Sequence, residues 1–188
     1  MSREIEVKAR IKNFDQVISK LRDLGCEITE PIIQDDKIFV HKDYGDYVKM
    51  HIGANILRIR TVNGEKSFFT LKQSVNNELD CIEKQTEILK PQEMHDALIM
   101  MGYENVVSVY KKRQKIKYKN YTICLDQVRD LGNFIEVERL FEDDKEMNGV
   151  QEEIIEFLKT LGVEEQDRET HGYDSLMYLK LNKKIINN

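Results

Sequence analysis

The stretch that decides the fold is EIEVKARI, residues 4–11, in which charged and apolar residues alternate strictly. Side chains on a β-strand point to opposite faces with a period of two. The four charged residues therefore share one face, and the four apolar residues share the other. On its own this pattern is typical of a half-exposed strand with one solvated face. Its meaning depends on whether the rest of the chain repeats it.

Several later segments repeat this design of one ionic face and one apolar face. Two of them flank Asn63-Gly64, a strong signal for a tight hairpin turn. Residues 31–40 and 121–126 predict two further strands, whereas 41–55 and 74–80 lack regular alternation and predict loops. The repeating segments are 56–60, 66–73, 82–89, 107–113 and 134–140.

Apolar residues recur at helical spacing in three other places, which predicts amphipathic helices over 14–24, 91–101 and about 150–161. Residues 173–181 predict a terminal helix. Each of the three amphipathic helices stops at a glycine, as helices commonly do. We expect the apolar stripe of the first helix to cover the Ile5 and Val7 face of the first strand.

Composition limits the class of protein. The 188 residues suffice for a single domain over 1–188 with one core, and we expect 183–188 to be a frayed tail. A net charge of −5 argues against nonspecific nucleic-acid binding. Three widely spaced cysteines and the lack of an apolar signal region or membrane-length run predict a cytoplasmic protein.

Two arrangements would satisfy the strand pattern. Helices that pack on the apolar faces leave the ionic faces pointing away, either into water on an open antiparallel sheet or into the interior of a closed barrel. On an open sheet the ionic groups would form surface salt bridges worth about 0–1 kcal/mol each. A sheet of about eight strands tends to close, because closure removes its exposed edges.

A barrel would gather the ionic groups in one lumen, where they are costly to desolvate unless paired or bound to a ligand. Arginine forks match phosphate oxygens, and carboxylates spaced i, i+2 on a strand can share Mg²⁺ or Mn²⁺. The lumen would therefore suit a polyphosphate bound with a divalent cation. Its basic residues would be Lys8, Arg10, Arg58, Arg60, Lys72, Lys111 and Arg113, and its acidic residues Glu4, Glu6, Glu83, Glu87, Asp126, Glu136 and Glu138.

In order along the chain, these motifs resemble the CYTH family of triphosphate tunnel enzymes. The family hallmark Glu-x-Glu-x-Lys is matched at residues 4–8, and Leu-Arg-x-Arg at 57–60. Thr70-Leu71-Lys72, the acidic strand 83–87, the basic residues 111–113 and the second acidic pair within 126–138 follow in the family's order. The resemblance implies an α+β fold, an eight-stranded antiparallel β-barrel with a charged lumen and helices packed outside.

The resemblance also implies roles for residues. The metal, Mg²⁺ or Mn²⁺, would be held by Glu4, Glu6, Glu87, Glu136 and Glu138. The triphosphate would be bound by Lys8, Arg10, Arg58, Arg60, Lys72, Lys111 and Arg113. Catalytic roles would fall to Lys8, Arg113 and Asp126. This chain departs from the family at Gln85, where relatives often carry Glu, and at Gly172, where they carry Ser before a tyrosine.

The family runs two reactions, and both rely on positioning and charge neutralisation. The compact length and the 126–138 segment resemble class IV adenylyl cyclases, which implies conversion of ATP to cyclic AMP and pyrophosphate. Hydrolysis of thiamine triphosphate or inorganic triphosphate is the alternative, and a noncatalytic nucleotide or polyphosphate binder is a third. The expected partners are a small-molecule triphosphate, such as ATP or thiamine triphosphate, and a second copy in a homodimer, with no nucleic acid or membrane.

Overall fold

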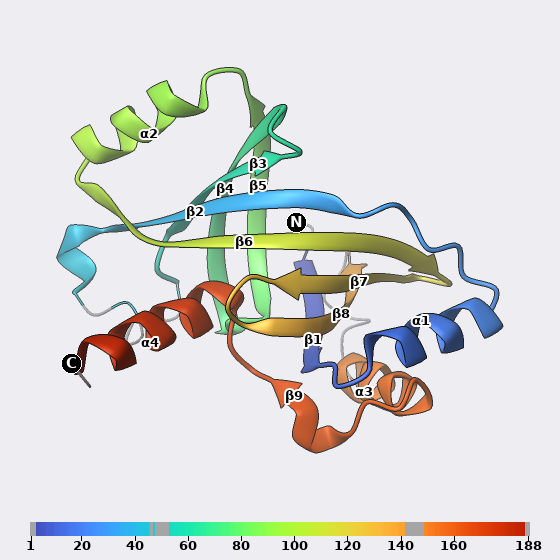
Figure 1. Cartoon of the computed structure of the whole chain (residues 1–188). Helices are drawn as coiled ribbons and strands as arrows, with labels where there is room; N and C mark the ends of the chain where they lie inside the picture. The colour runs from blue at the N-terminus through green and yellow to red at the C-terminus, as the bar shows by residue number, and fades with distance from the viewer. Residues whose placement is uncertain (1–2, 46, 48–52, 142–148, 187–188) are drawn as a thin grey trace.

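The structure is a computed structural model that describes residues 3–45, 47, 53–141 and 149–186, with the side chains of 3, 4 and 184–186 left undescribed. Figure 1 shows its helices and strands in chain order from blue to red. They are β1 (Arg3–Arg10), α1 (Phe14–Asp23), β2 (Ile32–His41), η1 (Lys42–Tyr44), β3 (Ile56–Val62), β4 (Lys66–Asn77), β5 (Asp80–Ile88), α2 (Pro91–Met100), β6 (Tyr103–Tyr118), β7 (Tyr121–Val128), β8 (Gly132–Phe141), α3 (Val150–Thr160), η4 (Glu165–Asp167), β9 (Arg168–Glu169) and α4 (Tyr173–Ile186).

Eight of these strands form a closed antiparallel barrel. They pair in the order β5-β4-β3-β2-β6-β7-β8-β1, and β1 returns to pair with β5. The closing contact is short, with Arg3, Glu4 and Ile5 opposite Ile82, Cys81 and Asp80. Farther along β1, the two-residue strand β9 pairs with Lys8 and Ala9. The predicted eight-stranded barrel is confirmed, and the alternative of an open sheet is excluded.

The hairpin between β3 and β4 turns at the predicted dipeptide. Asn63 and Gly64 have φ of 52° and 75°, and Val62 pairs with Lys66 across the turn. Both angles lie in the left-handed region, which asparagine and glycine adopt most readily. The turn therefore fixes the register that places Arg58 opposite Thr70 and Arg60 opposite Phe68.

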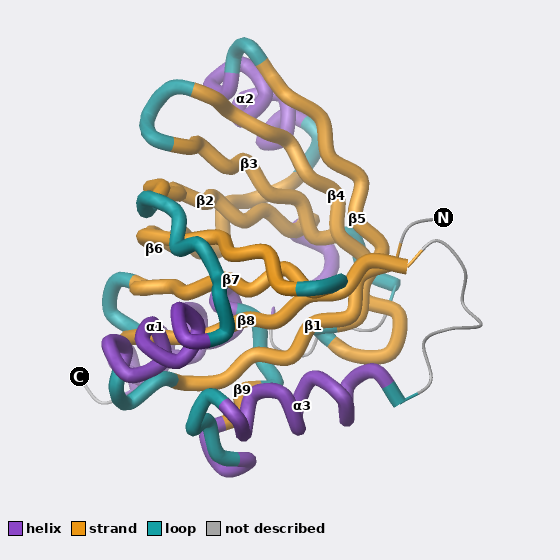
Figure 2. Tube along the Cα trace, turned by 90° about the vertical axis from the view of Figure 1, so that its right-hand side faces the viewer, coloured by secondary structure: helices purple, strands orange, loops and turns teal. Residues whose placement is uncertain are grey.

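The outer faces of β1, β7 and β8 are covered by α1 and α3 (Figure 2). Ile5, Val7 and Ile135 are buried in one cluster with Leu21 of α1 and Ile154 of α3. The Asn13 side chain accepts a hydrogen bond from the Gln16 amide at 3.1 Å and caps α1. The first helix therefore covers the apolar face of β1, as the sequence predicts.

The other two helices lie elsewhere on the barrel. Leu98 of α2 packs on Phe39, Leu57 and Ile59, on the side opposite α1 and α3 (Figures 1 and 2). The first turns of α4 cover apolar residues that continue the ionic faces of their strands toward one end of the barrel. Tyr173 and Met177 of α4 pack there with Ile38, Val107, Val109, Val128 and Phe134. One end of the lumen is therefore apolar and covered by α4.

Several element boundaries in the structure differ from those predicted from the sequence. β4 continues to Asn77 and β5 begins at Asp80, so the loop expected over 74–80 is a tight turn. α4 runs to Ile186, beyond the expected 173–181. Part of the expected 41–55 loop, residues 46 and 48–52, lies outside the described residues. Within the described chain, no helix has the length and apolar character needed to cross a membrane.

Candidate functional site in the barrel lumen

Three carboxylates line one side of the lumen, and we call Glu6, Glu136 and Glu138 the acidic wall. Glu6 lies opposite Glu138 and Lys8 opposite Glu136 in the β1–β8 register. The Lys8 ammonium lies 3.1 Å from Glu6 and 3.3 Å from Glu136. Burial, together with the charge of Glu136, raises the pKa of Glu6 to about 7. Burial beside Glu136 therefore disfavours the charged form of Glu6, despite the nearby Lys8 ammonium.

Arg113 of β6 reaches the acidic wall through a buried fork. Its Nε and Nη2 donate to Asp126 at 2.7 and 2.5 Å, and it also pairs with Glu136 and lies 3.7 Å from Glu138. Burial alone would raise the pKa of Glu136, but Arg113 and Lys8 hold it well below its usual range. Asp126 is fully buried and also accepts from the Tyr173 hydroxyl at 2.8 Å. Asp126 therefore orients Arg113 from behind.

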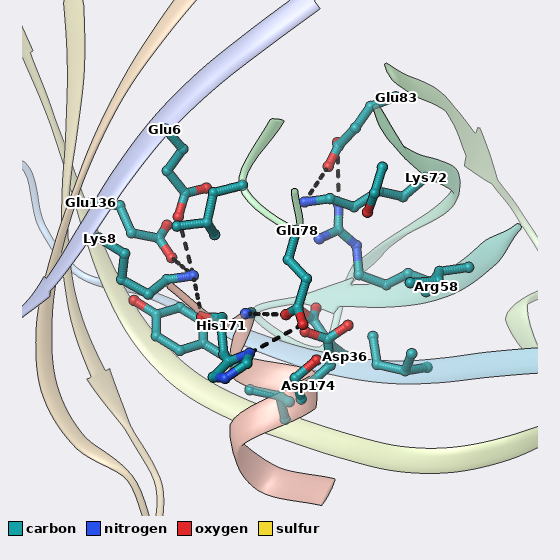
Figure 3. A pocket seen from close by; sticks show the side chains of 18 of the residues that line it. Glu6, Lys8, Asp36, Arg58, Lys72, Glu78, Glu83, Glu136, His171 and Asp174 are labelled. Carbon is teal, nitrogen blue, oxygen red and sulfur yellow. Dashed lines mark hydrogen bonds and ion pairs between the residues drawn. The ribbon is translucent and has the colours of Figure 1, made fainter. Parts of the chain in front are cut away.

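Four cations line the facing side, and we call Arg58, Arg60, Lys72 and Lys111 the basic wall. Arg60 donates through Nε and Nη2 to Asp36, both at 2.6 Å. Glu83 lies 3.2 Å from Lys72 and 3.7 Å from Arg58. Figure 3 shows Lys72, Arg58 and Glu83 across the cavity from Glu6, Lys8 and Glu136. Asp36 thus holds the Arg60 fork in place, whereas Arg58 Nε is buried without a hydrogen-bond partner among the described residues.

Lys111 differs from the other cations of its wall. Its side chain is 3% exposed, yet among the described residues it makes no hydrogen bond or ion pair. Its ammonium lies 4.8 Å from the ring centroid of Tyr173. Burial, together with the nearby Arg113 and Arg60, lowers its pKa to about 8, although Asp126 and Asp36 partly oppose this shift. An anion entering the lumen would supply the missing counter-charge.

The cavity between the two walls has a volume of about 790 Å³. This is within the usual range for a site that encloses a small organic ligand. Toward α4 its lining becomes apolar at Ile38, Ile56 and Val109. Glu78 closes this side, because it accepts from the Gly172 amide at 2.7 Å and lies 3.2 Å from the His171 ring (Figure 3).

The structure brings together most of the residues selected from the sequence. Those that line the cavity are Glu6, Lys8, Arg58, Arg60, Lys72, Glu83, Lys111, Arg113, Glu136 and Glu138. Arg10 and Glu87 are exposed and do not line it, and Arg10 pairs with Glu169 at 3.0 Å. Asp126 lies directly behind Arg113, and the side chain of Glu4 is outside the described residues.

Sequence reasoning missed several lining residues. Asp36 stands in a Gln-Asp-Asp-Lys run with polar residues on both faces, so alternation gives no signal. Tyr173 was noted only as the tyrosine after Gly172 at the start of the predicted terminal helix, and no role in the lumen was predicted for it. Glu78 and His171 lie 93 residues apart in the chain, and only the folded barrel brings them together.

The acidic wall fits a hard divalent cation. The Glu136 and Glu138 oxygens and the Cys124 sulfur lie within 4.8 Å of one another. Glu6 Oε1 is buried and accepts no hydrogen bond from the described residues, although it is ion-paired with Lys8. Carboxylate oxygens are the ligands that Mg²⁺ and Mn²⁺ prefer. Glu6, Glu136 and Glu138 are therefore the residues that could hold such an ion.

Comparisons with known proteins agree with this geometry. The CYTH domain profile matches residues 2–173. The Methanocaldococcus jannaschii protein named "Putative adenylate cyclase MJ0240" is 28% identical over 167 residues, covering 85% of this chain and 90% of that protein. The PH1819 protein of Pyrococcus horikoshii has a TM-score of 0.77 and 30% identity, over 94% of this chain and 99% of that one.

A more distant solved structure shares the fold alone. It is the Hippeastrum protein named "Putative adenylyl cyclase HpAC1" and described as having a dominant triphosphatase activity. It is 18% identical with a TM-score of 0.60, covering 92% of this chain and 91% of that one.

Proposed function

Because the chain belongs to the CYTH family, we propose that its lumen binds an organic triphosphate with a divalent cation and converts ATP to cyclic AMP and pyrophosphate. The observation that carries the proposal is Lys111, a buried ammonium that lacks a carboxylate partner among the described residues and faces a cavity lined by further cations. A buried unpaired charge is costly, so its presence supports a site completed by an anionic ligand.

A triphosphate suits the size and charge of the basic wall. Arg58, Arg60 and Lys72 reach the lumen from adjacent strands, β3 and β4, so their charges fall along one side of the cavity. Guanidinium groups bind phosphate oxygens in pairs, and lysines add point charge. The apolar lining at Ile38 and Val109 supports an organic group on the triphosphate, because inorganic triphosphate has nothing to place there.

Glu6, Glu136 and Glu138 would hold Mg²⁺ or Mn²⁺. When bound, such an ion neutralises phosphate charge and orients the reacting groups. Lys8 sits between two of these carboxylates, so it limits their mutual repulsion and adds a positive charge at the edge of the phosphate site. Arg113 touches the acidic wall and borders the basic wall, which places it where charge builds up on phosphate oxygens.

Cyclisation requires the oxygen of the ribose 3′-hydroxyl to bond to the α-phosphorus while the bond from that phosphorus to the β-phosphate oxygen breaks. Pyrophosphate leaves, and the hydroxyl proton passes to it or to solvent. The chain contributes by fixing the triphosphate and excluding water from the buried middle of the lumen. Names of relatives such as the M. jannaschii protein support this reaction. Asp126 is already engaged by Arg113 and Tyr173, so its part is to orient Arg113.

Hydrolysis of an organic triphosphate is the second candidate. The same charges would stabilise attack by water on the terminal phosphorus, and the Hippeastrum neighbour described as having dominant triphosphatase activity favours it. The thiamine group of thiamine triphosphate would occupy the apolar end of the lumen, as the nucleoside of ATP would, whereas inorganic triphosphate would leave this end empty.

The test is a product assay on the full chain with ATP, thiamine triphosphate or tripolyphosphate, each with Mg²⁺ or Mn²⁺. Cyclic AMP with pyrophosphate is the expected result, and orthophosphate without cyclic AMP would assign hydrolysis instead. If wild-type protein turns over none of the three, the protein is a noncatalytic binder.

Lys111→Met provides the matched structural test. It should weaken triphosphate binding by about ten-fold or more, because one buried charge contact is lost. Lys112→Met is the control, since Lys112 is the next residue on β6 and is exposed. Equal effects of the two variants in a calorimetric titration would place the triphosphate outside this lumen.

A further inference from the structure

Tyr173 is the first residue of α4 and its ring is buried inside the barrel, 6% exposed. The ammonium of Lys8 lies 4.3 Å from the centroid of this ring, and that of Lys111 lies 4.8 Å from it. Phe134 packs edge-on against it at 5.0 Å between centroids. One aromatic ring therefore contacts two ammonium groups of the lumen.

The two lysines depend on this ring to different degrees. Lys8 also forms ion pairs with Glu6 and Glu136 and donates a hydrogen bond to the His171 carbonyl, all at 3.4 Å or less. Lys111 has no hydrogen bond or ion pair in the described part of the chain. Arg113 and Arg60 repel it, and the attraction of Asp126 and Asp36 offsets this repulsion only in part. The electron-rich ring face attracts a cation without neutralising it. It can therefore hold the Lys111 ammonium in place and leave its charge for a ligand.

The hydroxyl of Tyr173 acts on a different cation. It donates to Asp126 at 2.8 Å, and Asp126 accepts both arms of the Arg113 fork. Fixing this carboxylate fixes the plane of the guanidinium. Through its ring and its hydroxyl, one residue is thus linked to Lys8, Lys111 and Arg113.

We propose that Tyr173 is a positioning residue for triphosphate binding, whose ring holds the Lys111 ammonium and whose hydroxyl orients Arg113 through Asp126. The inference rests on the proposed triphosphate site. Its consequence is that the first residue of α4 completes the basic lining, so the terminal helix contributes to ligand affinity as well as covering the end of the barrel.

The experiment is a calorimetric titration of the full chain with tripolyphosphate and Mg²⁺, using Tyr173→Leu and Tyr173→Met to remove the ring. Two replacements of different shape are used, so that if one variant fails to fold the other can still be titrated. Loss of the cation–π contacts should weaken binding by about ten-fold. Tyr173→Phe keeps the ring and should weaken binding by no more than about three-fold.

Tyr178→Leu is the matched control for helix packing. Tyr178 lies on α4 and its ring packs on Tyr47 at 5.1 Å, with no contact to Lys8 or Lys111 among the described interactions. It should lower the melting temperature but leave the affinity within about two-fold, since only remote packing changes.

A double-mutant cycle adds a readout that a general packing defect would not move. If the ring acts through Lys111, then Tyr173→Leu should cost clearly less affinity in a Lys111→Met background than in the wild type. Equal costs in both backgrounds, or an equal loss of affinity in Tyr178→Leu, would overturn the positioning role. Wild-type protein that binds neither tripolyphosphate nor a nonhydrolysable ATP analogue would overturn the proposed function itself, and this inference with it.

Discussion

The two walls of the lumen are each built mostly from neutralised pairs, and each holds one residue that is poorly neutralised. On the acidic wall this residue is Glu6, whose pKa is raised to about 7 by burial and by Glu136. On the basic wall it is Lys111, whose pKa is lowered to about 8 by burial and by Arg113. The shifts have opposite directions because burial disfavours the charged form of each group, which raises the pKa of a carboxyl and lowers that of an ammonium. A like charge nearby, Glu136 or Arg113, adds to each shift.

The difference supports the proposed binding of two ligands of opposite charge, a divalent cation and a triphosphate. A cation at Glu6 and an anion at Lys111 would each remove a repulsion that the ligand-free fold has to bear. The paired residues, such as Asp36 with Arg60, carry no such excess and hold neighbouring groups in place. Each wall therefore combines a rigid frame with one group whose charge is available to a ligand.

Arg113 joins the two walls, and its removal should have the largest effect. Arg113→Met leaves Asp126, Glu136 and Glu138 without their shared counter-ion in a buried site. Breaking a buried ion pair costs about 3–5 kcal/mol of unfolding free energy. Urea unfolding followed by circular dichroism measures the loss. Arg22→Met, at an exposed position of α1, serves as the control and should change stability by less than about 0.5 kcal/mol.

A loss at Arg113 no larger than at Arg22 would mean that the acidic wall tolerates its own repulsion. Arg113 would then not be needed to neutralise the carboxylates of the acidic wall.

The pH dependence of stability tests the two poorly neutralised residues directly. The folded pKa of Glu6 lies above its ordinary value of 4.5, so its stabilising contribution is lost as pH rises from 4.5 to about 7. The folded pKa of Lys111 lies below its ordinary 10.5, so its contribution is lost as pH falls from 10.5 to about 8. Across each of these pH ranges, the free energy of unfolding should change by about 3 kcal/mol.

The measurement is the difference in unfolding free energy between wild type and Glu6→Gln or Lys111→Met, in metal-free buffer from pH 4 to 10.5. Relative to wild type, Glu6→Gln should gain stability between pH 4.5 and 7, and Lys111→Met should lose relative stability between pH 8 and 10.5. Glu104→Gln and Lys112→Met, at exposed positions of β6, set the baseline. Two curves that slope in the same direction would show that the walls do not carry opposite excess charge.

The sequence predicts the faces of strands better than positions along the lumen. Strict alternation at 4–11 and looser alternation at 56–60 and 134–140 predicted which side chains share a face, and the structure places Glu6, Arg58 and Glu136 in one cavity. Closure itself depends on the pairing of Arg3 with Ile82, which local patterning cannot reveal. From the residues alone the open sheet therefore remained an alternative, although the number and recurrence of the strands already favoured closure.

Two predicted site residues that do not line the cavity, and two lining residues that were not predicted, show the same limit. Glu87 and Arg10 follow the alternation of their strands, but both lie near strand ends and are exposed. Asp36 and Tyr173 were missed because their roles depend on contacts with Arg60 and Asp126, from other elements. A period of two defines the face of a side chain, whereas its depth in the tunnel is set by the stagger of the strands.

Arg10 offers the smallest expected effect and the sharpest test of that distinction. It shares a strand face with Lys8, but its side chain is 47% exposed and pairs with Glu169, whereas that of Lys8 is 3% exposed between Glu6 and Glu136. Arg10→Gln should therefore change tripolyphosphate affinity by less than about two-fold and stability by about 0–1 kcal/mol, the usual contribution of an exposed ion pair. Lys8→Gln, measured in the same calorimetric and urea experiments, should weaken binding by about ten-fold or more, because its charge is buried at the edge of the phosphate site. Comparable losses in the two variants would mean that Arg10 reaches the ligand, and the boundary of the tunnel would then have to be extended to the end of β1.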